Sequence, residues 1–396
     1  MRKEVKNAVA IGVLCSVSYL AVYFARNILG AVTPQMIGTG NFTTEYIGSV
    51  SSIYFIFYAV GQLINGAIGD KIKARYMISF GLLLAGVTNL LFAHLPASSD
   101  IAAYAYGMTG FFLSMIYGPM TKVVAENTEP IYATRCSLGY TFASFFGSPL
   151  AGVAAAALVW QSVFAVSSAA LFVMAVLCFG FFLFFEKKGI VKYNQYKPEK
   201  QQGGSIKVLL KHRIVKFTLI SILTGVIRTT VVFWLPTYIS QYLGFSAEEA
   251  ASMYTVATFV ISFTTFIAVF IYERLKRNMD LTILLMFSVS ALAFLLVYLL
   301  KAPMLNMICI VLAIMASNGA ATMLWSRYCP SLRDTGMVSG ATGFLDFVSY
   351  MAASASSTIF ANAVADIGWG NLILVWMGLM IFGVVVALPY KRKQAK

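Results

Sequence analysis

The stretch YIGSVSSIYFIFYAVGQLINGAIGDKIKAR, residues 46–75, joins a long apolar run to a short charged segment. Its apolar part, residues 46–69, has about the length that an α-helix needs to cross ~30 Å of hydrocarbon. Similar runs recur along the whole chain of 396 residues, which is 59% hydrophobic and only 11% charged. Such a composition leaves too little polar surface for a water-soluble globule. The sequence therefore predicts a protein that crosses a lipid bilayer several times.

The apolar runs favour helices over the strands of a membrane barrel. Barrel strands alternate apolar and polar residues, whereas these runs are apolar on nearly every side. We expect an all-α integral membrane protein with twelve spanning helices, at residues 9–33, 46–69, 76–95, 101–121, 137–158, 162–185, 214–239, 248–272, 281–300, 303–325, 337–361 and 370–389.

The basic residues indicate how these spans are oriented. With the spans placed as above, 26 of the 29 Lys and Arg fall on the side of both termini, and only Lys301 falls on the other. Short loops rich in Lys and Arg stay in the cytoplasm. We therefore expect a multi-pass protein of the cytoplasmic (inner) membrane with both termini cytoplasmic. The net charge of +14 is a topology signal on this view, and we expect no nucleic-acid partner.

The longest polar segment divides the chain into two sets of six predicted spans. Residues 186–213 are rich in Lys and contain Gly-Gly and Pro, which is typical of a linker. We expect an N-terminal half at 1–186, a cytoplasmic linker at 187–213 and a C-terminal half at 214–396. The first predicted span of each half carries one arginine, which suggests two repeats related by a pseudo-two-fold axis.

Three charged side chains fall well inside predicted spans: Arg26, Arg228 and Asp346. A charge at this depth costs a few kcal/mol or more, so it usually has a function. A guanidinium binds carboxylate or phosphate through two parallel hydrogen bonds, and two of them would form a clamp for one small anion. One arginine could instead pair with Asp346, but a single carboxylate cannot neutralise both. Asp346 could also bind a proton and couple transport to a proton gradient.

Polar side chains recur at spacings of three and four along several spans. In the first span, Tyr19, Tyr23, Arg26 and Gly30 share one helix face. Similar faces on five further spans predict a wet central cavity. The alternative is that the Ser and Thr hydroxyls bond the carbonyls of their own helices.

The charged segment GAIGDKIKAR resembles the loop between spans 2 and 3 of the major facilitator superfamily. That loop follows the pattern Gly-x-x-x-Asp-Arg/Lys-x-x-x-Arg, which is matched here by Gly66, Asp70, Lys71 and Arg75. The resemblance implies the major facilitator fold and assigns these four residues to a gate motif at the cytoplasmic face.

Two further segments resemble one branch of that superfamily. YFARNILGAVTP, residues 23–34, and GVIRTTVVFWLPTYISQYLGFS, residues 225–246, are similar to spans 1 and 7 of the organophosphate:phosphate antiporters, the glycerol-3-phosphate and hexose-phosphate transporter type. The resemblance implies that Arg26 and Arg228 bind the substrate phosphate beside Tyr58. It also implies exchange for inorganic phosphate through a rocker-switch motion.

The chain departs from the glycerol-phosphate members of this branch at three positions. Gln62, Ala143 and Thr258 stand where those members carry a lysine, a histidine and an acidic residue. The resulting pocket is less positive, which leaves room for a monoanion, a carboxylate or a zwitterionic phosphodiester as well as a phosphate ester.

We expect a secondary transporter that moves a small organic anion by alternating access, in antiport with inorganic phosphate. Walker A, HExxH and GxSxG motifs are absent from the sequence, and we expect no enzyme activity, no cofactor and no bound metal.

The alternatives to the antiporter are a proton-coupled symporter of an organic acid and a transporter-like sugar-phosphate sensor. The protein is expected to act as a monomer in the lipid bilayer. The expected substrate-binding residues are Arg26, Arg228, Tyr23, Tyr58, Gln62, Tyr140, Tyr254 and Tyr350, with Asp346 as the coupling candidate.

Overall fold

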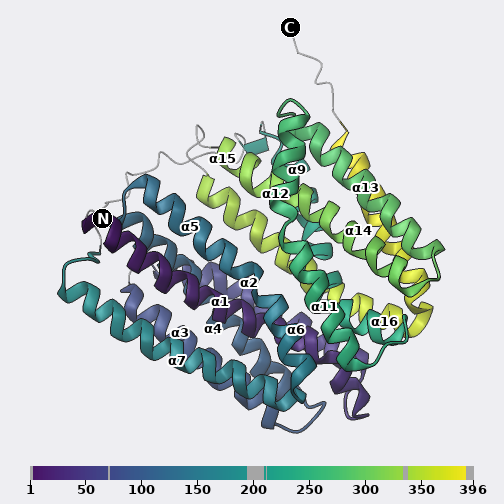
Figure 1. Cartoon of the computed structure of the whole chain (residues 1–396), viewed down its shortest axis with the longest axis horizontal. Coiled ribbons are helices and arrows are strands. Elements are labelled where there is room, and N and C mark those ends of the chain that lie inside the picture. The colour runs from purple at the N-terminus through teal and green to yellow at the C-terminus, as the bar shows by residue number, and fades with distance from the viewer. Residues whose placement is uncertain (1–2, 70–71, 194–208, 211, 333–337, 389–396) are drawn as a thin grey trace. The chain divides into compact units, whose positions relative to one another are not determined.

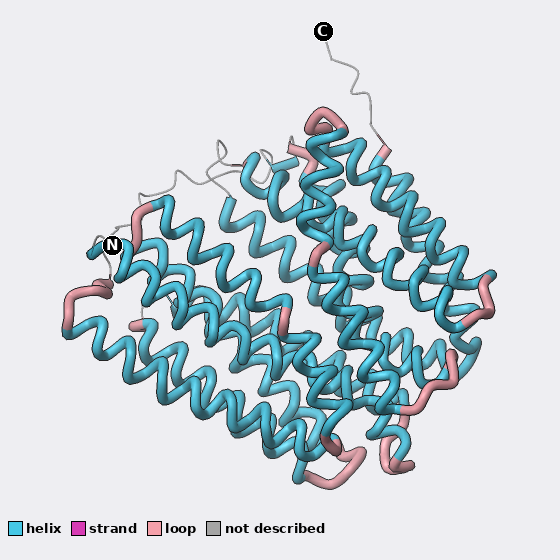
Figure 2. The backbone as a smooth tube through the Cα atoms, viewed as in Figure 1, coloured by secondary structure: helices cyan, strands magenta, loops and turns pink. Residues whose placement is uncertain are grey.

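The computed structural model describes residues 3–69, 72–193, 209–210, 212–332 and 338–388. All regular secondary structure in these ranges is helical, and short loops join the helices (Figure 2). The predicted all-helical membrane fold is therefore confirmed.

The described residues of the first half form seven helices, coloured purple to teal in Figure 1. They are α1 (Lys3–Gly38), α2 (Thr44–Gly69), α3 (Ala74–His94), α4 (Asp100–Asn127), α5 (Pro130–Phe145), α6 (Gly147–Ala157) and α7 (Trp160–Lys187).

The second half is interrupted more often. Its elements are α9 (Ile214–Gly225), the π-helical turn η1 (Val226–Val231), α10 (Val232–Gln241), α11 (Ala247–Ser262), α12 (Thr264–Arg274), α13 (Met279–Leu299), α14 (Pro303–Met323), the π-helical turn η2 (Leu324–Tyr328), α15 (Cys329–Ser331) and α16 (Val338–Ala387).

Nine helices in the described part of the chain are long and apolar enough to cross a membrane. Three further predicted spans correspond to α4, to the pair α5–α6 and to the second part of α16. The predicted spans 11 and 12 are the two parts of α16, which are separated by a kink at Gly368. Gly368 has a φ of 74°, a conformation that glycine adopts without the Cβ clash other residues meet.

Two predicted spans are broken near their middle. In span 5, Pro149 has no N–H to donate to the helix, and the amide of Phe146 closes a shorter turn onto the carbonyl of Ala143 at 3.2 Å. In span 8, the amide of Phe263 closes a similar turn onto Val260 at 3.1 Å, without any proline nearby. The first break has a signal in the sequence, whereas the second depends on packing.

The helices form two compact units, which are described separately. Unit 1 contains Met1–Glu199 and Phe233–Phe259, and unit 2 contains Lys200–Val232 and Val260–Lys396. In unit 1, α4 packs on α2 and α3, and α1 packs on α5, α6 and α7. In unit 2, α13 packs on α14 and α16, and α16 packs on α9. The predicted division into halves at 187–213 stays a prediction.

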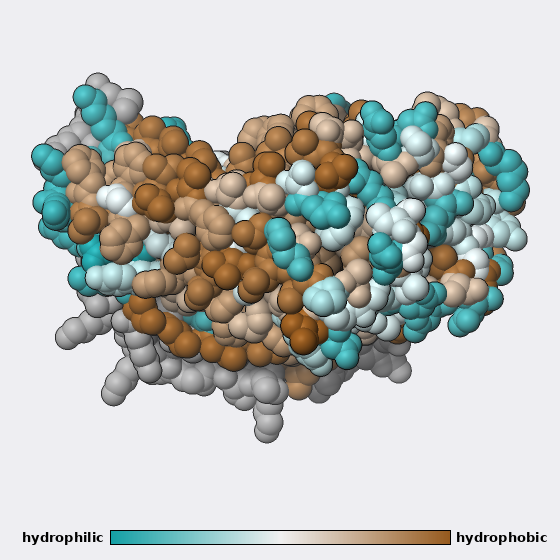
Figure 3. Space-filling view, turned by 90° about the horizontal axis from the view of Figure 1, so that it is seen from below, coloured by the Kyte–Doolittle hydropathy of each residue, from teal (hydrophilic) through white to brown (hydrophobic). Residues whose placement is uncertain are grey.

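Apolar side chains also cover much of the surface. Figure 3 shows a broad brown area on the face that it presents, beside an area where polar residues dominate. Large apolar residues such as Ile101 and Val176 are exposed. Exposed apolar helix faces of this kind are what a lipid environment requires.

Candidate functional site

Arg26 lies near the middle of α1 in unit 1 and is half-buried between two tyrosine rings. Its guanidinium carbon is 5.3 Å from the ring centroid of Tyr23 and 5.1 Å from that of Tyr58. A cation over an aromatic face is attracted by about 0.5–2 kcal/mol. The two rings therefore orient the guanidinium while leaving its positive charge in place.

Tyr58 is itself held by a column of rings. It stacks on Tyr54 at 6.3 Å, and Tyr54 stacks on Tyr106 of α4 at 5.0 Å. All three tyrosines are buried. Gln62 lies one helical turn beyond Tyr58 on α2 and is half-buried. Tyr23 thus lies beside Arg26 as the spacing on α1 indicates, and Tyr58, which the resemblance places beside Arg26, reaches it from a second helix.

Tyr140 of α5 belongs to a second ring cluster of unit 1. Its ring centroid is 6.0 Å from Tyr19 of α1 and 6.1 Å from Tyr117 of α4. Tyr19 and Tyr117 are 5.5 Å apart. Tyr117 was not among the residues expected from the sequence, because its contacts depend on the packing of three helices.

Arg228 lies in unit 2, within the π-helical turn η1. A π-turn contains an extra residue, and such turns occur often at functional sites. Arg228 is half-buried, and among the described residues of the chain it forms no ion pair. A guanidinium in an apolar helix with no acidic partner is suited to a ligand anion.

The helix that carries Arg228 packs closely against α16. The hydroxyl of Ser221 donates to the carbonyl of Leu345 at 2.8 Å, and that of Thr230 donates to the carbonyl of Ala353 at 3.0 Å. A Cβ on Gly225 would lie 2.9 Å from the carbonyl oxygen of Ser349. The two helices therefore run parallel in a fixed register at these three points.

This register separates Arg228 from Asp346 along the helix axes. Asp346 follows Leu345 in the sequence and therefore lies at the level of Ser221. Ser221 precedes Arg228 by seven residues, a rise of about 10 Å along a helix. The two side chains form no ion pair with each other. Asp346 is half-buried, and Tyr350, one turn further along α16, is buried. Pairing of Asp346 with Arg228 is therefore not the arrangement that the structure adopts.

Tyr254, another predicted substrate-binding residue, packs between two helices of unit 1. It is buried in α11, which belongs to unit 1, and forms a hydrogen bond with Ser148 of α6. Nearby, Thr255 approaches α6 so closely that Gly152 has no room for a Cβ. Tyr254 therefore contributes to the packing of α11 on α6.

The predicted gate motif is only partly described. Asp70 and Lys71 lie outside the described residues, and Gly66 lies in α2. Arg75 of α3 donates to Glu186 near the end of α7 at 2.9 Å, and its other Nη donates to the Tyr76 hydroxyl at 2.7 Å. The acidic partner of Arg75 that the structure provides is therefore Glu186, which the sequence analysis did not single out.

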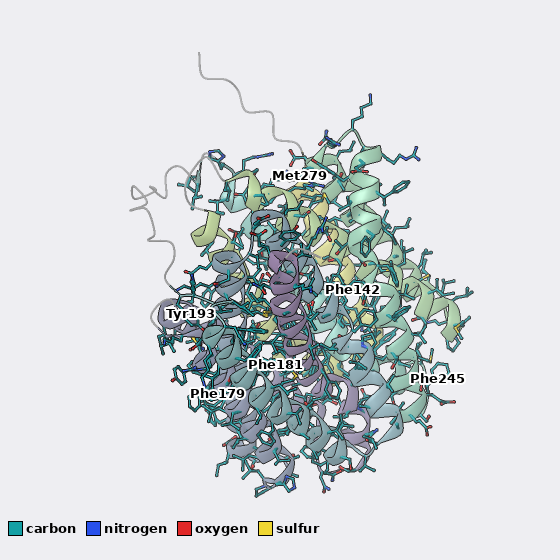
Figure 4. The ribbon with its side chains drawn as sticks, turned by 60° about the vertical axis from the view of Figure 1, so that its left-hand side comes forward. Phe142, Phe179, Phe181, Tyr193, Phe245 and Met279 are labelled. Carbon is teal, nitrogen blue, oxygen red and sulfur yellow. The ribbon has the colours of Figure 1, made fainter. Side chains whose placement is uncertain are left out.

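The segment after α7 folds back onto this ion pair. The hydroxyl of Tyr193 donates to Glu186 at 2.9 Å, and the amide of Lys192 donates to the side-chain oxygen of Asn127 at 2.6 Å. Figure 4 shows Tyr193 on the same side of unit 1 as Phe179, whose ring also contacts Arg75. Burial and the Glu186 carboxylate raise the pKa of Tyr193 above its ordinary value. The start of the predicted linker is thus anchored to unit 1.

A cavity of about 320 Å³ lies at the turn between α10 and α11. Its lining contains Glu248 and Glu249 and none of the predicted substrate-binding residues. Two carboxylates at its wall make it unsuited to an anion. The candidate residues are therefore considered within each unit by itself: Arg26 with Tyr23 and Tyr58 in unit 1, and Arg228 in unit 2.

Comparison with known proteins identifies the family. The sequence profile described as Major Facilitator Superfamily matches residues 15–357. The chain belongs to the Major Facilitator Superfamily. A solved structure of a bacterial homologue of the human lysosomal transporter Spinster, inward-facing and unoccupied, shares this fold. It superposes with a TM-score of 0.75 at 13% identity, over 98% of this chain and 95% of that one.

Two curated relatives are similar to this chain, and the name of the first includes a phosphate ester. The glycerol-3-phosphate transporter of Bacillus subtilis is 21% identical over 98% of this chain and 93% of its own length. The membrane sensor protein UhpC of Salmonella typhimurium is 31% identical over 96 residues, which are 24% of this chain. The match with UhpC spans only about a fifth of that relative, 21% of its length. The resemblance inferred from spans 1 and 7 is thereby confirmed.

Proposed function

We propose that this transporter moves a small organic anion bearing a phosphate group across the cytoplasmic membrane, in exchange for inorganic phosphate. Alternating access would carry the anion from one side to the other. The protein would act as a monomer with both termini in the cytoplasm, as the distribution of 26 of its 29 basic residues favours.

One observation carries the proposal: each half of the chain holds one half-buried arginine inside an apolar span. The two side chains are oriented by different structural features. Arg26 is oriented by two aromatic rings, and Arg228 is presented by a π-turn without an acidic partner among the described residues. Two guanidinium groups have the charge and the planar donor geometry that a phosphate needs. A relative whose name includes glycerol-3-phosphate supports the same choice of anion.

A thermal-shift measurement on purified protein tests the anion clamp. Inorganic phosphate and glycerol 3-phosphate should raise the melting temperature, because a ligand that binds only the folded state stabilises it. The shift should be lost in Arg26→Lys and in Arg228→Lys, since an ammonium cannot reproduce the forked contact.

Arg274→Lys is the matched control for this measurement. Arg274 is exposed and lies 5.1 Å from the ring of Phe270, so it resembles Arg26 in its aromatic contact but lies at a helix end. A shift that survives both Arg26→Lys and Arg228→Lys would overturn the clamp. A shift lost in Arg274→Lys as well would indicate non-specific binding.

A second candidate function is proton-coupled symport of an organic acid. Asp346 favours it, because a half-buried carboxyl group within a membrane helix can take up and release a proton. The two functions differ in whether a pH gradient drives accumulation.

A further inference from the structure

Four basic side chains lie at the turn between α12 and α13 in unit 2. Arg274 is the last residue of α12, Lys276 and Arg277 belong to the turn, and Arg327 comes from η2, which continues α14. All four are exposed. The guanidinium carbon of Arg327 lies 4.9 Å from the ring of Tyr272 on α12, so two spans contribute bases to one place. We call these four basic residues the basic turn.

The backbone of the turn is strained at two of these bases. Lys276 and Arg277 have φ values of 54° and 57°, in the left-handed region that side chains with a Cβ disfavour. The amide of Arg277 donates to the carbonyl of Tyr272 at 2.9 Å and closes the end of α12. Helix ends of this kind usually place glycine or asparagine in the left-handed position. Cations therefore occupy positions that a neutral residue would fill with less strain.

The charge of the basic turn is not neutralised by the described part of the chain. None of its four members forms an ion pair there. Asp280, close by in the sequence, is already paired with Arg213 at 2.8 Å and Lys216 at 3.1 Å. Glu273 is exposed and leaves three positive charges in excess. The basic turn is therefore suited to an anion from outside the protein.

An exposed apolar column on α12 leads to the basic turn. Phe266, Phe270 and Arg274 are spaced four residues apart and share one helix face. The two phenylalanines are 59% and 57% exposed, and Ile267 beside them is exposed as well. The guanidinium carbon of Arg274 lies 5.1 Å from the ring of Phe270. The column is thus apolar along the helix and positive at its end.

We propose that the basic turn and this column bind one anionic phospholipid. The headgroup phosphate would lie at the four bases, and the acyl chains would lie along Phe266 and Phe270. Bases at a membrane surface attract anionic headgroups, and exposed phenylalanine side chains are removed from water by hydrocarbon. A soluble anion would contact only the bases, because it has no part that covers the column. The proposal does not depend on the proposed transport function.

Native mass spectrometry of the purified full-length protein tests the lipid site through the affinity for the first bound lipid. Phosphatidylglycerol should bind more tightly than phosphatidylcholine with the same acyl chains. The double substitution Lys276→Asn/Arg277→Asn should weaken phosphatidylglycerol about ten- to thirty-fold and leave phosphatidylcholine unchanged. Asparagine tolerates the left-handed conformation, so the turn is kept. Phe270→Ala should weaken phosphatidylglycerol about threefold, because it removes part of the column.

Lys187→Asn/Lys188→Asn is the matched control, since it removes two exposed bases at the end of α7 in unit 1. It should change the affinity for phosphatidylglycerol by less than about twofold. Equal weakening by the two double substitutions would mean general attraction to basic residues and would overturn the proposal. An unchanged affinity in Lys276→Asn/Arg277→Asn, or equal wild-type affinities for the two lipids, would overturn it too. Displacement of the lipid by soluble glycerophosphoglycerol would instead indicate a site for free phosphodiesters, and the lipid site would be wrong.

Discussion

Arg26 and Arg228 are positioned by different means, although the sequence presents them as equivalents. Tyr23 and Tyr58 fix the direction of the Arg26 side chain, whereas the backbone of η1 presents Arg228. Spacing on one helix reveals Tyr23, because residues three apart share a face. It does not reveal a π-turn, whose sequence VIRTTV shows no glycine or proline.

Gln62, half-buried and one turn from Tyr58, is the position at which the charge near Arg26 can be changed. Gln62→Lys would add a positive charge one turn from Tyr58 and should favour dianions, since attraction grows with the charge of the ligand. We expect the affinity for glycerol 3-phosphate to rise about tenfold at pH 8, where the ester is dianionic, and less at pH 5.5, where much of it is monoanionic. Isothermal titration at both pH values measures this.

Gln62→Met is the neutral control for that substitution. It should leave the ratio of the two affinities unchanged. An equal gain at both pH values in Gln62→Lys would mean that the added charge does not act on the phosphate.

Asp346 is the coupling candidate at the residue scale. If it carries the proton, Asp346→Asn should abolish accumulation driven by a pH gradient while phosphate exchange continues, because exchange needs no net proton movement. Uptake into vesicles with and without an imposed pH gradient distinguishes the two activities. Accumulation that still follows the gradient would remove Asp346 from the coupling role.

At the scale of elements, the packing of α9 and η1 on α16 determines where Arg228 lies. Ser221, Gly225 and Thr230 are the contact points, and Gly225 is the position without room for a side chain. The sequence shows these small residues but not their partners, because the pairing of two helices does not follow from the pattern of either one.

Gly225→Ala should therefore destabilise the protein. The added methyl would meet the backbone of Ser349, and overpacking of this kind costs about 1–3 kcal/mol. The melting temperature in detergent is the measurement. Gly378→Ala is the control, since nothing lies within 4 Å of its Cβ position, and it should be neutral or slightly stabilising. Equal melting temperatures for the two variants would contradict the close contact.

The contact of Tyr193 with Glu186 predicts a dependence of stability on alkaline pH. The pKa of Tyr193 is higher in the folded protein than the ordinary value of about 10. As the pH rises past 10, the unfolded chain loses the proton first, so the free energy of unfolding falls.

Tyr193→Phe removes this contribution to the pH dependence. Its melting temperature should be slightly lower than that of the wild type at pH 8, through the lost hydrogen bond, and should fall less between pH 9 and pH 11. Identical slopes for the two proteins over this pH range would show that Tyr193 is not held in its protonated form.

At the scale of the whole molecule, the sequence predicted the spans well and the contacts poorly. Length and hydrophobicity are local properties, so each predicted span from 9–33 to 370–389 has a helical counterpart. The partner of Arg75 was missed because Glu186 lies 111 residues away. Tyr117 was missed for the same reason: only the packing of α1, α4 and α5 brings its ring to Tyr19 and Tyr140.

The central claim is that two arginines, one from each half, carry a phosphate-bearing anion in exchange for phosphate. Purified protein reconstituted into vesicles loaded with inorganic phosphate tests it directly. Labelled phosphate outside should enter only when phosphate is present inside, an external phosphate ester should inhibit its entry, and Arg228→Lys should abolish it. Entry that proceeds at the wild-type rate in Arg228→Lys, or wild-type vesicles that exchange no phosphate at all, would contradict the account.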